Sequence, residues 1–501
     1  MQTWVPQTAR FVAAVFLLAL GCVAAAAPER SAIGPDAARH LLNRTGFEAH
    51  PAEIDALATL SRAEAVERIL SGTGQAARTP PPAWVGEFTS PRVVRTLSDV
   101  ERKEFQRRQV ERAVELKNWW VAEMLATPSP LTERMTLFWH NHFTSSLQKV
   151  RSASLIYRQN VLLREQALGN FATLLKAVSK DPAMLVYLDS ATNRRGKPNE
   201  NFAREVMELF TLGEGNYTEQ DIREAARAFT GWSIDVESGE FLWRPFAHDG
   251  GTKAVLGRSG EFKGDDVLDI LLDRPETAVF VVNKLWKEFV SPDPDPAEVK
   301  RIAAVFRKSG YDIKSALRAL LTSDAFYSPR NRGTLVKSPV DFVIGTMRQF
   351  DIGYSDPLPL TVLLRTLGQD LFSPPNVRGW PGGEAWINST TLLARRQFLE
   401  RLFRVDESRM QAQMVDGPMK GLNRLGKPGE GRERFMRAAL DIRFSGGEWV
   451  RQFDRAGGGV APGGRIQEVL LAVPPASQIP DDSRGVDLVR RLTADPAYQL
   501  K

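Results

Sequence analysis

The chain has 501 residues, of which 43% are hydrophobic and 25% charged, and its formal net charge at pH 7 is +6. These values are ordinary for a globular protein, and the length suggests about three domain-sized units. Lysine and arginine are scattered among nearly as many acidic residues, without a run of five like charges. A polybasic arm is therefore not indicated, and we expect no nucleic-acid partner.

Segment 1–26 has the pattern of a secretory signal peptide. Arg10 precedes an apolar stretch over residues 11–20, and small residues continue to Ala27. The apolar stretch is too short for a membrane-spanning helix, which takes roughly 20 residues. We therefore expect cleavage after Ala26 and an exported protein, periplasmic or secreted, without a transmembrane span.

Cys22 is the single cysteine of the chain and lies within this predicted signal. The pair Gly21–Cys22 resembles a bacterial lipobox, which would make Cys22 a lipid anchor. The order Ala19–Leu20 departs from the usual leucine-then-small pattern, so we favour release over anchoring. In either case the mature chain has no free thiol, which excludes disulfides, c-type haem and zinc–thiolate sites.

Helix signals dominate the rest of the sequence. Ser61 and Ser98 each precede a glutamate by three residues, which is the pattern of a capping box. Proline, serine, threonine or asparagine stands at most of the other expected starts. Helices are expected to begin near Pro35, Ser61, Ser98, Leu131, Ser154, Asn170, Asn199, Thr218, Thr277, Pro296, Ser338 and Asn388.

One β-hairpin is expected around residues 232–245. Trp232 and Ile234 alternate with polar residues before a turn, and Phe241 and Trp243 alternate after it. The predicted fold class is therefore all-α, a multi-helix body with one small hairpin.

Composition divides the chain after the signal peptide into three parts. We expect a main helical domain over residues 27–415 and a glycine-rich, variable connection over residues 416–464. A C-terminal helical segment over residues 465–501 is expected to pack back on the body.

Several strings together resemble one known family. They are residues 40–46 (HLLNRTG), 134–143 (RMTLFWHNHF), 199–213 (NENFAREVMELFTLG), 225–232 (AARAFTGW), 248–253 (HDGGTK), 372–383 (FSPPNVRGWPGG) and 495–500 (DPAYQL). In this order they resemble the DUF1800 family, a domain of unknown function. The resemblance implies an exported bacterial protein, often encoded beside an exported protein of the DUF1501 type. It carries over no catalytic residue.

His140 and His142 are candidate metal ligands. Histidines separated by one residue share a face of an extended backbone and can chelate a metal there. On a helix the same spacing points them roughly 200° apart, given 3.6 residues per turn. Because the preceding residues indicate a helix, we favour buried core histidines, with a divalent metal as the alternative. Nucleotide-binding motifs are incomplete, so no nucleotide is expected. No haem is indicated either, because the mature chain lacks the cysteines of a c-type haem site.

Glu205 and Glu208 are candidate catalytic carboxylates, since they share one face of the helix predicted from Asn199. The alternative is a ladder of ion pairs from Glu200 through Arg204 to Glu208, because these residues are four apart. We favour the ladder.

His248 and Asp249 form the candidate catalytic loop that we rank first, because two glycines follow them and functional residues favour such loops. Lys253 closes the loop as a candidate ligand-binding residue. The alternative is an ordinary tight turn. Arg194 and Arg195 form either a basic rim for an anionic ligand or a solvated turn.

Arg378, Trp380 and Trp386 lie in a proline- and glycine-rich loop. They form either a stacking platform for an envelope glycan or a plug of tryptophans in the helical core. The sequence favours neither.

Two hypotheses for function follow. The first is an accessory or binding module of the bacterial envelope that acts with a secreted partner such as a DUF1501-type protein. The second is a metal-assisted hydrolase that uses the region of His140, His142 and His248, with the metal activating water. We favour the first, because no complete catalytic motif is present.

Overall fold

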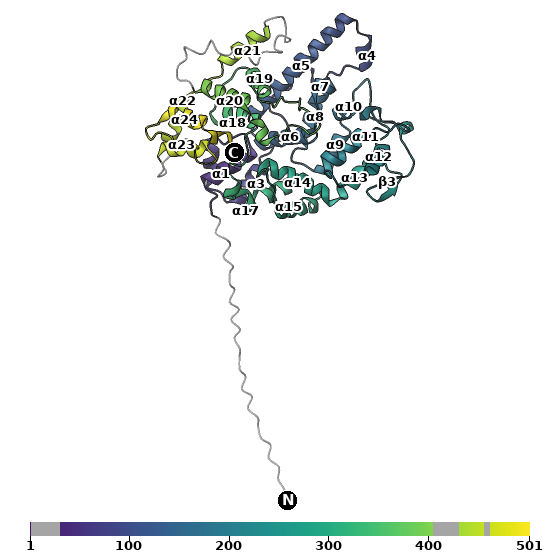
Figure 1. Cartoon of the computed structure of the whole chain (residues 1–501), viewed down its shortest axis with the longest axis horizontal. Coiled ribbons are helices and arrows are strands. Elements are labelled where there is room, and N and C mark those ends of the chain that lie inside the picture. Colours follow the sequence, from purple (N-terminus) through teal and green to yellow (C-terminus); the bar gives the residue numbers. More distant parts are fainter. Residues whose placement is uncertain (2–30, 404–429, 455–460) are drawn as a thin grey trace.

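The structure is a computed structural model that describes residues 1, 31–403, 430–454 and 461–501 (Figure 1). The predicted signal peptide with Cys22 lies outside these residues, and so does part of the predicted connection over residues 416–464. The described part of that connection contains two complete helices, α21 (Glu430–Leu440) and α22 (Gly446–Asp454), and the first residues of α23 (Pro462–Leu470). They form because each buries an apolar face, which includes Trp449 of α22.

The fold is mainly helical, as predicted. The first half of the chain contributes α1 (Pro35–Thr45), α2 (Pro51–Ala58), α3 (Arg62–Ser71), α4 (Pro91–Thr96), α5 (Asp99–Ala126), α6 (Pro130–His142), α7 (Leu147–Val150), α8 (Ala153–Glu165), α9 (Phe171–Ser179), α10 (Pro182–Tyr187), α11 (Glu200–Glu205) and α12 (Glu219–Ala228). Beside α21 and α22, the second half contributes α13 (Gly264–Asp273), α14 (Pro275–Phe289), α15 (Pro296–Lys308), α16 (Ile313–Leu321), α17 (Asp324–Tyr327), α18 (Pro339–Gln349), α19 (Leu358–Thr366), α20 (Ser389–Leu402), α23 (Pro462–Leu470) and α24 (Gly485–Ala494).

Both predicted capping boxes are present. The Ser98 backbone N–H donates to Glu101 at 2.8 Å, and the Ser98 hydroxyl accepts from the Glu101 backbone N–H. Ser61 caps α3 in the same way. These bonds satisfy amides that the first turn of a helix leaves free, which explains why local sequence locates these helix starts.

Two short antiparallel hairpins cover part of the surface. In the predicted hairpin, β1 (Trp232–Ile234) pairs with β2 (Phe241–Trp243), with Trp232 opposite Trp243. A second hairpin, β3 (Lys253–Val255) with β4 (Arg258–Gly260), was not predicted. Its strands read Lys-Ala-Val and Arg-Ser-Gly, so they lack the large apolar and aromatic residues that mark β1 and β2 in the sequence.

Segments from the two ends of the described chain lie side by side. In Figure 1 the purple α1 lies near the green α18 and the yellow α23 and α24. Gln349, at the end of α18, donates both to Ala49 O after α1 and to Val469 O of α23. Arg44 of α1 reaches the Lys501 carbonyl at 2.8 Å. The core is therefore closed by contacts between distant parts of the sequence.

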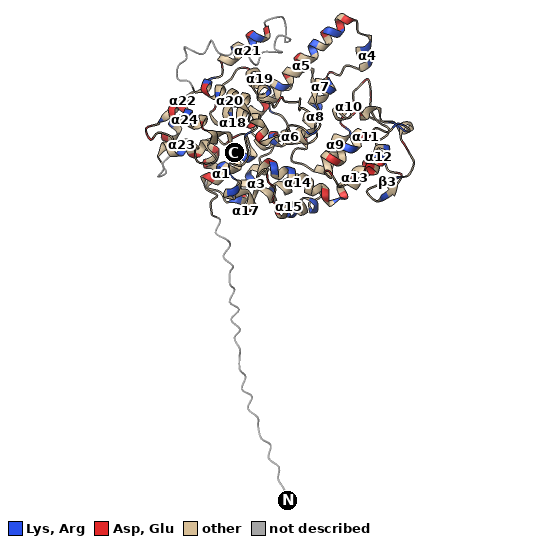
Figure 2. Cartoon of the chain, in the orientation of Figure 1, with Lys and Arg blue, Asp and Glu red and all other residues tan. Residues whose placement is uncertain are grey.

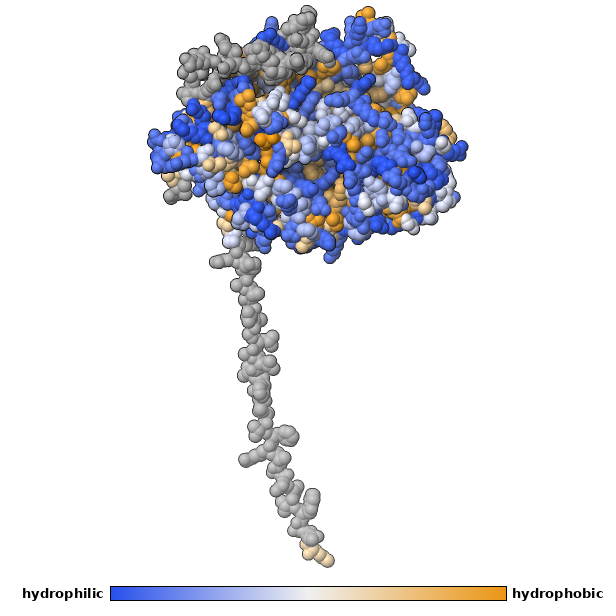
Figure 3. Space-filling view, in the orientation of Figure 1, coloured by the Kyte–Doolittle hydropathy of each residue, from blue (hydrophilic) through white to orange (hydrophobic). Residues whose placement is uncertain are grey.

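The helical pair α4 and α5 projects from the body at the top of Figure 1. Basic and acidic residues, blue and red in Figure 2, are interspersed along this arm. Val93 and Val100 are exposed on it. Hydrophilic residues cover most of the face shown in Figure 3. Among the described residues, no helix is both long and apolar enough to cross a membrane.

Candidate functional site

A π-helix lies at the junction of several predicted site residues. The segment η3 (Val206–Thr211) continues α11 with wider turns, and the Leu212 N–H donates to Met207 O at 2.8 Å. It packs against α14 and faces the end of α6. Such π-helical turns are rare in proteins as a whole, and those that occur are often found at functional sites. We call this junction of α6, η3, α14 and residues 376–380 the joint.

His142, at the end of α6, is hydrogen-bonded at both ring nitrogens. Its Nε2 lies 3.1 Å from Phe210 O, and its Nδ1 lies 3.1 Å from Lys284 Nζ. A carbonyl oxygen only accepts and the lysine donates, so the ring carries its hydrogen on Nε2 and accepts at Nδ1. Burial holds the pKa of His142 well below its usual value, and the charge of Lys284 lowers it further. This neutral ring has no lone pair left for a metal.

Lys284 of α14 was not predicted as a site residue. Its Nζ donates to His142 Nδ1 and to Leu209 O at 3.0 Å, so both partners are uncharged. Burial lowers the pKa of the Lys284 amine to about 8, and the nearby charge of Lys287 adds to this shift. A lysine within an amphipathic helix looks like any surface lysine in the sequence, so no local signal identifies it.

The outer edge of the joint is a cluster of charged residues. Glu208 accepts from the Tyr217 hydroxyl at 2.9 Å and from Arg378 at 2.9 Å, and Arg378 also reaches Glu214 at 2.8 Å. Burial raises the pKa of Glu205, and the neighbouring Glu208 carboxylate raises it further. We call Glu205, Glu208, Glu214, Tyr217 and Arg378 the rim. It brings the predicted Glu205–Glu208 pair together with the predicted Arg378.

The predicted ion-pair ladder is present in its first step. Arg204 lies 3.5 Å from Glu200. Its shorter bonds, both 2.8 Å, go to the two carboxylate oxygens of Glu219 at the start of α12. Glu208 pairs with Arg378 instead. Arg378 lies in a loop, so the spacing of residues within one helix could not have indicated this partner.

The loop with the two predicted tryptophans docks on the end of α6. The Trp380 backbone N–H donates to Asn141 Oδ1 at 2.7 Å. Trp380 and Trp386 are buried, with only 5% and 6% of each residue's surface exposed. Neither therefore offers a ring face to solvent, as a stacking platform requires. The predicted alternative, a plug in the core, describes their position.

His140 lies on the other side of α6 from His142. Its ring is 5.7 Å from Trp120, 5.5 Å from Phe372 and 5.6 Å from Trp380, between ring centroids. Nε2 of His140 has no hydrogen-bond partner among the described residues. Burial lowers the pKa of His140 to about 4, because an imidazolium is poorly solvated in this aromatic environment.

This lowered pKa predicts a pH dependence of stability. The unfolded chain, with a histidine pKa near 6.5, binds more protons than the folded chain between pH 6.5 and 4, so unfolding becomes easier as the pH falls through this range. Between pH 7.5 and 5 we expect His140 to account for about 2 kcal/mol of lost stability. Urea unfolding of the wild type and His140→Phe at both pH values measures this difference. Equal losses of stability in the two proteins would contradict this prediction. Burial also lowers the pKa of His40, to about 3, but His40 contributes equally to the wild type and the variant.

The predicted His248 loop is not part of the joint. Its side chains form hydrogen bonds with the end of α12 and with the loop's own backbone. His248 Nδ1 lies 2.9 Å from Thr230 O, and Asp249 accepts from Arg227 at 2.8 and 3.2 Å. The hydrogen bond from Arg227 lowers the pKa of Asp249 to about 2. Lys253 is buried and donates to the carbonyls of Asp249 and Gly251.

The predicted basic residues lie beside this loop. Arg194 and Arg195 are exposed, and the Arg195 backbone N–H donates to Ala247 O at 2.7 Å. The structure thus forms two groups of predicted site residues, one at the joint and one at the His248 loop. Within the described ranges, no three histidine, cysteine, aspartate or glutamate side chains are arranged to hold a metal ion.

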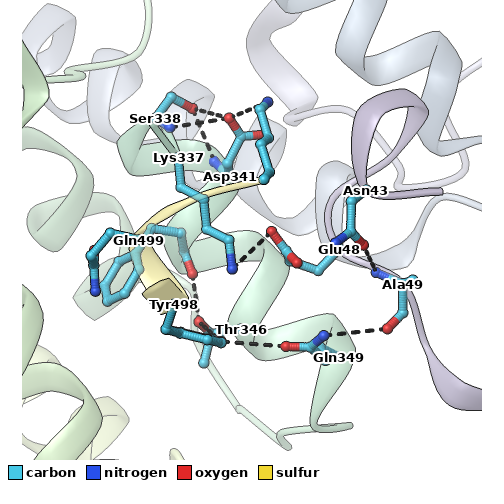
Figure 4. Close-up of polar contacts among 12 residues, drawn as sticks. Asn43, Glu48, Ala49, Lys337, Ser338, Asp341, Thr346, Gln349, Tyr498 and Gln499 are labelled. Carbon is cyan, nitrogen blue, oxygen red and sulfur yellow. Dashed lines mark hydrogen bonds and ion pairs between the residues drawn. The ribbon is translucent and has the colours of Figure 1, made fainter. Parts of the chain in front are cut away.

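A buried charged network, which the sequence did not predict, lies between α1 and α18 (Figure 4). The Glu48 and Lys337 side chains form an ion pair at 3.1 Å, and each is only 1% exposed. The Lys337 amine lies 3.9 Å from the centre of the Tyr498 ring. Figure 4 shows the Glu48 and Lys337 side chains pointing toward each other, Glu48 from the segment that follows α1 and Lys337 from the segment that precedes α18.

Asp341 of α18 connects two further cations. It accepts from Arg134 and, at 2.7 Å, from Lys501. Burial alone would raise the pKa of Asp341, but Arg134 and Lys501 hold it well below its ordinary value. Arg134 belongs to one of the strings that carry the family resemblance, and Tyr498 belongs to another. Membership of these strings was the signal in the sequence that could have indicated Arg134 and Tyr498.

The family model described as "Protein of unknown function (DUF1800)" matches residues 40–500. No curated protein and no solved structure matches the chain. The matched range includes the joint, the His248 loop and nearly all of the buried network. The chain therefore belongs to the DUF1800 family.

Proposed function

We propose that this protein is an exported binding module of the bacterial envelope, which acts with a secreted partner such as a DUF1501-type protein. The observation that carries the proposal is how three of the candidate site residues, a metal ligand, a catalytic carboxylate and a ligand-binding lysine, are engaged. His142 is bonded at both nitrogens, Asp249 is held by Arg227 and Lys253 is bonded to two backbone carbonyls. Groups held in this way support a folded framework better than they support turnover.

The rim is the part of the joint that a partner would meet. The Arg378 and Glu214 side chains are 63% and 67% exposed, while Glu208 beneath them is 16% exposed. An ion pair this exposed contributes little to stability, roughly 0–1 kcal/mol. Its charges are therefore available to a partner that carries complementary groups, and such groups govern the rate and specificity of association.

Charge reversal of Arg378 tests the proposal. Arg378→Glu places a third carboxylate beside Glu208 and Glu214, so repulsion disrupts the rim without removing an apolar contact. We expect affinity for the purified DUF1501-type partner to fall at least about ten-fold, which corresponds to 1.4 kcal/mol. Isothermal titration calorimetry on the two purified proteins measures it.

A matched control is available in Arg258→Glu. Arg258 pairs with Asp273 at the same distance of 2.8 Å, and the two side chains are 53% and 59% exposed. We expect this variant to bind the partner as the wild type does. An equal loss in both variants would indicate a general charge effect and contradict a role for the rim. Metal-dependent hydrolysis of phosphate or ester substrates by the isolated chain would favour the hydrolase instead.

A further inference from the structure

Two neighbouring loops form an exposed surface that the proposed function does not use. The loop of residues 194–197 lies against residues 245–248, because the Arg195 backbone N–H donates to Ala247 O at 2.7 Å. This bond places the cations of the first loop beside the exposed phenylalanine of the second. We call the four residues concerned the basic patch: Arg194, Arg195, Lys197 and Phe246.

The first loop is held in a fixed position by Asn193, which is only 3% exposed. The Asn193 carbonyl accepts from the Gly231 N–H at 3.1 Å. Its side chain donates to Ala226 O at 3.1 Å and accepts from the Asn199 N–H at 2.9 Å. A buried polar side chain that is satisfied in this way makes its surroundings rigid. A binding partner therefore meets a preformed surface, and little conformational entropy is lost on binding.

The cations of the basic patch have no counter-charge in the described protein. Arg194, Arg195 and Lys197 are exposed, and none of the three side chains forms a hydrogen bond or an ion pair with another residue in the described ranges. The carboxylate of Asp189, which precedes the loop, is already paired with Lys149 at 2.7 Å. The patch therefore has three uncompensated positive charges, which attract an anionic partner.

Phe246 adds an apolar group to this charged surface. It lies in the short 3₁₀-helix η4 (Pro245–Ala247) and is 79% exposed. Among the large hydrophobic residues that the structure describes, only the terminal Met1 is more exposed. Covering such a ring removes apolar surface from water, which is favourable. A partner that suits the patch therefore offers both negative charge and an apolar medium.

We propose that the basic patch docks the protein on an anionic lipid surface, with Phe246 entering the boundary between headgroups and acyl chains. Attachment of this kind combines the burial of apolar groups with attraction to anionic lipids. Arginine suits phosphate groups, because its planar guanidinium donates two parallel hydrogen bonds to them. An anionic polysaccharide would also attract the cations, but it offers the Phe246 ring no apolar medium. This inference does not depend on the proposed partner binding.

Co-sedimentation with vesicles tests the inference. The purified mature protein is mixed with vesicles of phosphatidylcholine alone, or of phosphatidylcholine with an equal part of phosphatidylglycerol. We expect binding to the anionic vesicles only, and most of it should be lost at about 0.5 M salt, where exposed charges are screened. The double variant Arg194→Gln, Arg195→Gln should weaken binding about 25-fold, which is about five-fold for each cation. Phe246→Ser should weaken it at least about ten-fold.

The double variant Arg307→Gln, Lys308→Gln is the matched control for charge. These residues are also an adjacent pair of exposed cations, at the end of α15, so the net charge changes equally. Leu393→Ser is the control for the ring, because Leu393 is another exposed apolar residue, at 57%. Both controls should bind the anionic vesicles as the wild type does. Arg378→Glu should do so too, which separates this inference from the proposed function.

Three results would overturn the inference. The first is equal binding of the wild type to neutral and anionic vesicles, or to neither. The second is an equal loss of binding in the patch variants and their controls, which would indicate a general effect of charge or hydrophobicity. The third is retention of the wild type on immobilised dextran sulfate without binding to vesicles, which would assign the basic patch to a polysaccharide.

Discussion

Replacing Asp341 by asparagine is expected to lower the free energy of unfolding by about 3–5 kcal/mol. The substitution keeps the shape of the side chain but removes the charge that Arg134 and Lys501 share. Both cations are nearly inaccessible to water, with side chains 3% and 4% exposed. Arg134 keeps its ion pair with Glu288 at 2.5 Å, but Lys501 loses the carboxylate that it contacts, and an unpaired charge in such an environment is strongly destabilising. Urea unfolding followed by circular dichroism measures the change.

Asp324→Asn is the matched control. Asp324 also forms an ion pair with an arginine, Arg62, at 2.6 Å, but its side chain is 98% exposed. We expect this variant to lose less than about 1 kcal/mol, because solvent screens exposed pairs. Similar losses in the two variants would mean that the network around Asp341 does not behave as a buried one.

Replacing Gly379 by alanine is expected to destabilise the protein by about 4 kcal/mol and to release the loop from α6. Gly379 has φ +82°, a conformation that costs an alanine about 1–2 kcal/mol. The added methyl would also lie 2.8 Å from the Asn141 carbonyl oxygen and closer still to its Oδ1. Overpacking of this kind adds about 1–3 kcal/mol. Hydrogen exchange of residues 376–386, together with urea unfolding, measures both effects.

Gly383→Ala separates backbone strain from the clash. Gly383, in the same loop, also has a positive φ, of +57°, but an added Cβ would meet nothing within 4 Å. We expect a loss of about 1 kcal/mol and unchanged hydrogen exchange in the loop. If Gly379→Ala is no worse than this control, the close contact with Asn141 does not hold the loop in place.

Local chemistry allowed the helical fold to be predicted. Ser98 and Asn388 cap the helices that follow them by bonds to amides three residues away, and such bonds depend only on neighbouring residues. The hairpin of β1 and β2 was predicted for the same reason, since its alternation and its turn lie within one short segment. The helix expected near Thr277 begins two residues earlier, at Pro275.

The composition of the site could not be predicted in this way. Glu208 meets Arg378 across 170 residues, and Lys284 meets His142 across 142. Spacing within one helix indicates which side chains share a face, but not which loop or helix will face them. The π-helix has no sequence signature comparable to a capping box, and it determines which carbonyls Lys284 and His142 reach.

The contact between Arg44 and Lys501, 457 residues apart, has a consequence for the order of folding. Chains whose contacts are far apart in sequence fold slowly, because long loops must close before these contacts can form. The helices around Arg44 therefore lack the contact with Lys501 until residue 501 has been synthesised. The other acceptors of Arg44, the carbonyls of Phe289, Val290 and Asn331, are all made earlier, so the bond to Lys501 is the last of the four that can form.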